Sequence, residues 1–114
     1  MTIDFYWSKG SPRSQAALLT IRALELDVNF KEVKMYEGEQ VKTKFLSINP
    51  EHCLPTIVDG DFKLWESRVI STYLVSQYGK NDNLYPKDAK SKASVDRLMY
   101  FDSSVLNARF ADYI

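Results

Sequence analysis

The segment LPTIVDGDFKLW, residues 54–65, restricts the possible folds more than any other part of this chain. Two short runs rich in β-forming residues flank Asp59-Gly60, a dipeptide typical of tight turns between antiparallel strands. Pro55 has no backbone N–H, so it suits the entrance of a strand, where that donor is not needed. The sequence therefore predicts a β-hairpin over residues 54–65 with its turn at Asp59-Gly60.

Before the hairpin, the pattern predicts two strands, each followed by a helix. Residues 3–7 are β-formers, and Ser11 and Pro12 after them suit the N-cap and the first position of a helix. Apolar residues at helical spacing extend this helix to residue 25. We expect the remaining elements to be a strand over 28–33, a turn at Gly38 and a short helix over 42–48.

After the hairpin, the apolar spacing predicts a helix over 67–78 closed by Gly79. Residues 80–87 are rich in Asn, Asp and Pro and are typical of a linker. A long helix is expected from about Asp88. Its apolar face is formed by Val95, Leu98, Met99, Phe101, Val105, Leu106 and Phe110.

This order of elements predicts an α/β fold, specifically a thioredoxin-like βαβαββα domain over residues 1–79. We expect a mixed four-stranded sheet with helices on both of its faces. Residues 88–114 are expected to form the first helix of an incomplete helical C-terminal domain, which begins an all-α domain after the linker at 80–87.

Charge and composition exclude several classes of function. Fifteen Lys and Arg balance fifteen Asp and Glu without long runs of either sign, so nucleic acid and membrane surfaces are poor partners. Cys53 is the only cysteine and His52 the only histidine. We therefore expect no intramolecular disulfide and no metal site, and a soluble protein of the cytoplasm.

Three loops of the predicted fold meet at one edge of the sheet, and each carries a candidate binding group. Ser11 could donate a hydrogen bond to a thiolate, and together with the helix dipole it would lower a thiol pKa by about one to two units. The backbone at Leu54 could pair with an extended peptide. Sequence alone favours a trans bond before Pro55, because only about 5–6% of such bonds are cis.

The third loop, Glu66-Ser67, has two interpretations. A helix N-terminus with a hydroxyl suits a ligand carboxylate, and Glu66 can hold an ammonium group, which together would recognise an amino-acid head group. The simpler interpretation is an ordinary helix cap with an acidic first turn.

The chain resembles the insect delta-class (or closely related epsilon-class) cytosolic glutathione transferases. The resemblance covers the whole chain and is most specific in three strings: Gly10-Ser11-Pro12, Asn49-Pro50-Glu51-His52-Cys53-Leu54-Pro55-Thr56 and Trp65-Glu66-Ser67-Arg68. Members of that family have about two hundred residues in two domains.

The resemblance implies a site and a function. Ser11 would be the catalytic residue that stabilises the glutathione thiolate, and Pro55 would be cis. The glutathione-binding residues would be Gln40, where the family has a histidine, His52, Cys53, Leu54, Pro55, Glu66, Ser67 and Arg68. The electrophile pocket would be lined by Ser8, Pro12, Asn107, Phe110 and Tyr113. The implied activity is conjugation of glutathione to small apolar electrophiles by a cytoplasmic homodimer.

Two alternatives stay open at this point. The first is a non-catalytic glutathione-binding or interaction fragment that lacks most of the electrophile site. The second is a glutaredoxin-like thiol redox enzyme using Cys53. The second is less favoured, because such an enzyme needs its cysteine at the first helix N-terminus, where this chain has Ser11.

Overall fold

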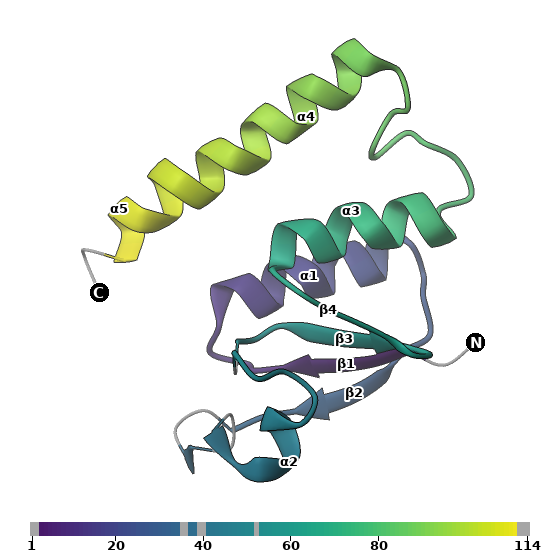
Figure 1. Ribbon diagram of the computed structural model, residues 1–114. Coiled ribbons are helices and arrows are strands. Elements are labelled where there is room, and N and C mark those ends of the chain that lie inside the picture. The colour runs from purple at the N-terminus through teal and green to yellow at the C-terminus, as the bar shows by residue number, and fades with distance from the viewer. Residues whose placement is uncertain (1–2, 35–36, 39–40, 52, 112–114) are drawn as a thin grey trace. The chain divides into compact units, whose positions relative to one another are not determined.

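The structure is a computed structural model that describes residues 3–34, 37–38, 41–51 and 53–111, apart from the side chains of residues 43, 110 and 111. The chain divides into two compact units, Met1–Gly79 and Lys80–Ile114. The first unit contains the sheet, and the second is helical (Figure 1).

A four-stranded mixed sheet forms the centre of the first unit. Its strands are β1 (Ile3–Trp7), β2 (Asn29–Glu32), β3 (Thr56–Asp59) and β4 (Phe62–Trp65), in the spatial order β2-β1-β3-β4. β1 runs parallel to β2 and antiparallel to β3, which in turn is antiparallel to β4. The predicted thioredoxin-like sheet is confirmed.

The hairpin turn lies one residue later than the sequence predicts. Asp59 still belongs to β3 and pairs with Phe62, so the two loop residues are Gly60 and Asp61. Gly60 has a φ of 64°, and glycine adopts this region without the steric cost that a Cβ imposes.

Helices cover both faces of the sheet. On one face, alternate residues of β1, Ile3 and Phe5, are fully buried against α1 (Pro12–Ala23) and α3 (Ser67–Tyr78). On the opposite face, Tyr6 packs against a smaller cluster near α2 (Thr43–Leu46), with its ring centroid 5.6 Å from that of Phe45. That cluster consists of Val33, Phe45 and Leu54.

Several elements are shorter than predicted, because tertiary pairing and capping set their ends. β2 pairs only with residues 4–7 of β1, and it spans 29–32 instead of 28–33. α1 ends at Ala23 instead of residue 25, since Glu25 turns the chain with a φ of 54°. The amides of Glu25 and Leu26 donate to carbonyls of the last helical turn. The predicted helix 42–48 covers only 43–46.

The helix predicted over 67–78 is confirmed as α3, but its end differs in kind from the expected one. Gly79 has φ −65° and ψ 140°, which is extended backbone, so it does not act as a left-handed cap. A hydroxyl contact of 2.9 Å between Thr20 and Ser71 joins α1 to α3.

The second unit is not one continuous α-helix. α4 (Ala89–Phe101) begins after Asp88, whose carboxylate accepts the Ser91 amide at 2.9 Å. A π-helix, η3 (Asp102–Leu106), follows and leads into α5 (Asn107–Ala111). In the expected apolar face, Leu98, Phe101 and Leu106 are exposed, and three further members are half-buried: Val95, Met99 and Val105.

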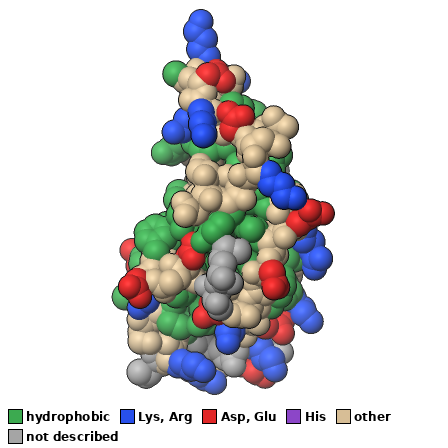
Figure 2. All heavy atoms as spheres, turned by 90° about the vertical axis from the view of Figure 1, so that its right-hand side faces the viewer, with side chains coloured by type: hydrophobic (Ala, Val, Ile, Leu, Met, Phe, Trp, Pro, Cys, Tyr) green, Lys and Arg blue, Asp and Glu red, His purple; other side chains and the backbone are tan. Residues whose placement is uncertain are grey.

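The surface carries charges of both signs. On the face seen in Figure 2, acidic and basic side chains are interspersed, which agrees with the balanced composition. None of the helices in the described ranges has the length and apolar character needed to cross a membrane.

Asp59 connects the hairpin to α3. Its Oδ2 accepts the hydroxyl of Tyr73 at 2.6 Å and also that of Tyr78. The hydrogen bond to Asp59 raises the pKa of Tyr73, with burial adding to the effect, and the same two causes raise the pKa of Tyr78. This contact has no local sequence signal, because it joins residues that are 14 and 19 positions apart in the chain.

These shifts predict a loss of stability in alkali. Above about pH 10 the unfolded tyrosines ionise while the folded ones keep their protons, so the free energy of unfolding falls as the pH rises towards the folded pKa values. Urea unfolding at about pH 8 and about pH 11 should show a smaller loss for the double variant Tyr73→Phe/Tyr78→Phe than for wild type. Tyr100→Phe, at a side chain that is 75% exposed, should behave like wild type. Equal losses in all three proteins would contradict the assignment.

Candidate functional site

Strand register brings the three candidate loops to one edge of the sheet. Thr56 pairs with Tyr6 on one side and with Trp65 on the other. The chain therefore leaves β1, enters β3 and leaves β4 at the same end of the sheet (Figure 1). The loops at this end are residues 8–11, 49–55 and 66–68.

Ser11 is the N-cap of α1, as predicted. Its backbone is extended, and its Oγ accepts the amide of Ser14 at 3.2 Å. Because the oxygen is used as an acceptor, the hydroxyl proton is left to donate. The side chain is half-buried at the positive end of a twelve-residue helix, an environment that favours an anion.

Ser14 has a structural role in the same loop. It is fully buried, and its Oγ accepts the amide of Ser8 at 3.2 Å. The Ser8 carbonyl in turn accepts the amide of Ser11. These bonds fix the turn between β1 and α1 and thereby set the position of Ser11.

The second loop is held by the buried side chain of Asn49. Its Nδ2 donates to the Cys53 carbonyl at 3.2 Å and to the Thr56 hydroxyl at 3.0 Å, and its Oδ1 accepts the Glu51 amide at 2.9 Å. Thr56 Oγ1 also donates to the Cys53 carbonyl at 2.7 Å. Asn49 and Thr56 are both fully buried, so this network is shielded from water.

Leu54 presents its backbone at the end of this network. Its side chain is 8% exposed and packs with Val33 and Phe45, whereas its own N–H and C=O make no hydrogen bond to the described residues. The Leu54–Pro55 bond is cis, as the resemblance implied. The free backbone groups suit pairing with an extended peptide.

Glu66 at the third loop has a strained backbone. Its φ of 84° and ψ of 106° lie outside the regions that a residue with a Cβ normally adopts. Its side chain does not cap α3 but pairs with Arg68, Nη1 to Oε1, at 3.0 Å. The interpretation as an ordinary side-chain cap is therefore wrong, and the first amides of α3 are left without that partner.

Ser67 and Arg68 complete this loop. Ser67 is the first residue of α3 and is 4% exposed, and the Arg68 side chain is 14% exposed. A largely shielded guanidinium at the first turn of α3 suits a carboxylate, and the exposed Glu66 carboxylate next to it suits an ammonium group.

Other predicted glutathione contacts are placed only in part. Cys53 is exposed, and its thiol donates to the Glu51 carbonyl at 3.3 Å. Gln40 and His52 lie outside the described residues.

The predicted electrophile-pocket residues are divided between the two units. Ser8 is half-buried and Pro12 exposed in the first unit, while Asn107 is half-buried in α5 of the second. The Phe110 side chain and Tyr113 lie outside the described part of the structure. Within the residues that are described, no three His, Cys, Asp or Glu side chains group as metal ligands.

Residues 1–76 match the family described as "Glutathione S-transferase, N-terminal domain". This chain belongs to the glutathione S-transferase family. Glutathione S-transferase D7 of Anopheles gambiae is 45% identical over 113 residues, which cover 99% of this chain and 52% of that relative. This chain thus spans about half the length of this relative.

Solved transferase structures support the same assignment. A delta-class glutathione transferase from Nilaparvata lugens is 43% identical with a TM-score of 0.92, covering 96% of this chain and 52% of that one. A glutathione transferase homologue from Drosophila mojavensis with bound glutathione is 42% identical with a TM-score of 0.89, covering 91% and 48%. The predicted resemblance to insect transferases is confirmed.

Sequence reasoning missed two supports of the candidate transferase site. One is the side chain of Asn49. Its oxygen accepts the backbone amide of the residue two positions later, which is a turn that asparagine commonly forms, so a local signal was available. The other is the contact of Trp65, whose Nε1 donates to Glu51 Oε2 at 2.7 Å. That contact joins β4 to the second loop and has no local signature.

Asn49→Ala should destabilise the fold by about 2–3 kcal/mol, because it leaves buried partners without hydrogen bonds. The matched control is Asn29→Ala, which removes one exposed 3.0 Å bond to Asp4 and should cost less than about 1 kcal/mol. Urea unfolding would measure both. A cost for Asn49→Ala no larger than that of the control would contradict the role of the network.

Proposed function

We propose that this chain supplies the glutathione site of a cytoplasmic glutathione transferase that conjugates reduced glutathione to small apolar electrophiles. The observation that carries the proposal is Ser11. Its hydroxyl proton is free to donate at the N-terminus of α1, on the same sheet edge as the open Leu54 backbone and the start of α3. The bound glutathione in the Drosophila mojavensis homologue supports this choice of ligand.

The proposed role of Ser11 is to stabilise the thiolate. A free thiol with a pKa of about 8.5 is only a few per cent ionised at neutral pH. A hydrogen bond to a charged acceptor contributes about 1.5–3 kcal/mol, and one pKa unit corresponds to about 1.4 kcal/mol. Ser11 and the helix dipole together therefore lower the thiol pKa by about one to two units. The thiolate sulfur then bonds to the electrophilic carbon, and the leaving group departs with its electron pair.

The other loops would hold the rest of the peptide. We assign the backbone of Leu54, beside cis Pro55 and Cys53, to the cysteinyl part of glutathione, with His52 and Gln40 towards its glycine end. The γ-glutamyl head group would place its carboxylate at Ser67 and Arg68 and its ammonium group at Glu66.

The electrophile would lie beside the thiolate, against Ser8 and Pro12 of the first loop. Burial there would exclude water and hold the electrophile near the sulfur.

Ser11→Ala should restore a near-normal pKa to the thiol of bound glutathione, about one to two units above the wild-type value. Ultraviolet absorbance of the bound thiolate against pH measures this directly, and conjugation of an aryl halide should fall far more than glutathione binding. Because the substitution also removes a helix cap worth about 1 kcal/mol, the control is Asp88→Ala, which removes the cap of α4.

The control should keep the lowered thiol pKa. An unchanged thiol pKa in Ser11→Ala would refute the role of Ser11, and loss of the shift in Ser8→Ala instead would assign the thiolate contact to Ser8.

We also propose that the protein forms a homodimer. Leu98 and Leu106 on the second unit are 60% and 56% exposed, and large apolar side chains that are this exposed to water favour association. Light scattering should show a dimer or larger species. The double variant Leu98→Glu/Leu106→Glu should shift the mass towards the monomer, whereas Lys90→Glu on the same helix should not. A wild-type monomer would contradict this proposal.

A further inference from the structure

The side chains of Trp65 and Glu51 join two of the three loops at the candidate site. Trp65 is the last residue of β4 and directly precedes Glu66, and its Nε1 donates to Glu51 Oε2 at 2.7 Å. Glu51 belongs to the second loop, residues 49–55, which carries Leu54. The contact therefore connects the loop assigned to the γ-glutamyl head group with the loop assigned to the cysteinyl part of glutathione.

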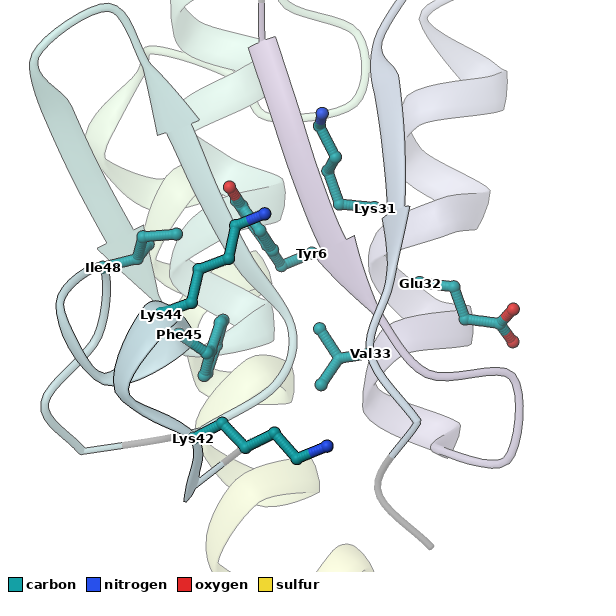
Figure 3. Close-up of a pocket in the computed structure, with 8 residues that line it drawn as sticks. All are labelled: Tyr6, Lys31, Glu32, Val33, Lys42, Lys44, Phe45 and Ile48. Atoms are coloured by element: carbon teal, nitrogen blue, oxygen red, sulfur yellow. The ribbon is translucent and has the colours of Figure 1, made fainter. Parts of the chain in front are cut away.

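Strand register fixes the position of Trp65 on the sheet. Thr56 pairs with Tyr6 on one side and with Trp65 on the other, so the three residues form one row across three strands. Residues that pair directly point to the same face of a sheet. Trp65 therefore lies on the face that carries α2, where Tyr6 packs against Phe45 (Figure 3). The indole reaches the second loop from a paired strand position.

Glu51 is held at three of its atoms. Its amide donates to Asn49 Oδ1 at 2.9 Å, its carbonyl accepts the Cys53 thiol at 3.3 Å, and its carboxylate accepts the Trp65 indole. The first two bonds lie within the second loop, whereas the third connects that loop to β4. The indole is thus attached to a residue whose backbone belongs to the network that positions Leu54.

On its other side, Trp65 adjoins the strained backbone of Glu66. The chain turns from β4 into α3 at this one residue, with a φ of 84° and a ψ of 106°. Backbone strain of this kind persists only where the surrounding structure holds it in place. The indole contact restrains the residue directly before the turn, and Ser67 and Arg68 follow directly after it.

We infer that Trp65 and Glu51 are positioning residues that set the spacing between the two ends of the glutathione site, an inference that rests on the proposed function. Neither side chain has to touch the ligand. A ligand that spans both loops binds more tightly when they are already held at the correct spacing, because binding then does not have to order them. Without the contact, the second and third loops would move separately.

The test compares three thiol ligands bound to the whole chain. Glutathione and γ-glutamylcysteine would contact both loops, whereas cysteinylglycine would contact only the second loop. Trp65→Phe should weaken binding of the first two ligands about five- to tenfold, because one hydrogen bond is lost, and should leave cysteinylglycine binding unchanged. Amide chemical-shift titrations under reducing conditions measure all three Kd values.

Variants of Glu51 separate the hydrogen bond from the charge. Glu51→Ala and Glu51→Gln both remove the carboxylate charge, but glutamine keeps a side-chain oxygen that can accept the indole N–H. Glu51→Ala should therefore weaken glutathione binding as much as Trp65→Phe does, and Glu51→Gln should bind nearly like wild type. The double variant Trp65→Phe/Glu51→Ala should bind no more weakly than either single variant, because both remove the same contact.

The matched control is Trp7→Phe. Trp7 Nε1 is buried and has no hydrogen-bond partner among the described residues, so the same substitution removes no such contact there. This variant should bind glutathione like wild type, whatever its effect on thermal unfolding.

Four results would overturn the inference. They are unchanged glutathione binding in Trp65→Phe, equal weakening of all three ligands, equal weakening by Glu51→Ala and Glu51→Gln, and equal weakening by Trp7→Phe. Each of these leaves the proposed function standing, provided that wild type binds glutathione and lowers its thiol pKa through Ser11. A wild-type chain that does not bind glutathione would refute the proposed function and this inference together.

Discussion

The buried amide of Asn49 is the constraint on which the candidate site depends most. It bonds to the Cys53 carbonyl, the Glu51 amide and the Thr56 hydroxyl, so one side chain fixes both ends of the loop that carries Leu54. Thr56 is also the first residue of β3, and it pairs with both neighbouring strands. The loop is therefore positioned against the sheet edge by contacts that water cannot replace, and the backbone at Leu54 can remain open without collapsing.

The order of elements could be predicted from the sequence, because apolar periodicity and turn residues are local properties. Their ends could not, since these depend on contacts made elsewhere. The strand β2 stops where its pairing with β1 stops. The helix α1 ends at Ala23 because Glu25 turns the chain with a positive φ, and glutamate is not a residue type that indicates such a turn. The hairpin turn was misplaced by one residue, because Asp59 is used as a paired strand residue that accepts two tyrosine hydroxyls.

The candidate site was predictable to a different degree at each loop. Ser11 followed by Pro12 is a strong local capping signal, and the structure places Ser11 at that position. The cis bond at Pro55 was predicted only through the resemblance, since isolated residues favour trans. The strained backbone of Glu66 had no signal at all, because nothing in a Glu-Ser dipeptide indicates a positive φ.

The π-helix between α4 and α5 changes how the end of the chain should be aligned. The amide of Asn107 donates to the carbonyl of Asp102, five residues back instead of four. Each residue of an α-helix advances about 100° around the axis, so the extra residue rotates everything after Leu106 by roughly that angle. Heptad positions counted straight through from Ala89 therefore assign the residues of α5 to the wrong side of the helix. Deletion of one residue within 102–106 would restore the uninterrupted phase.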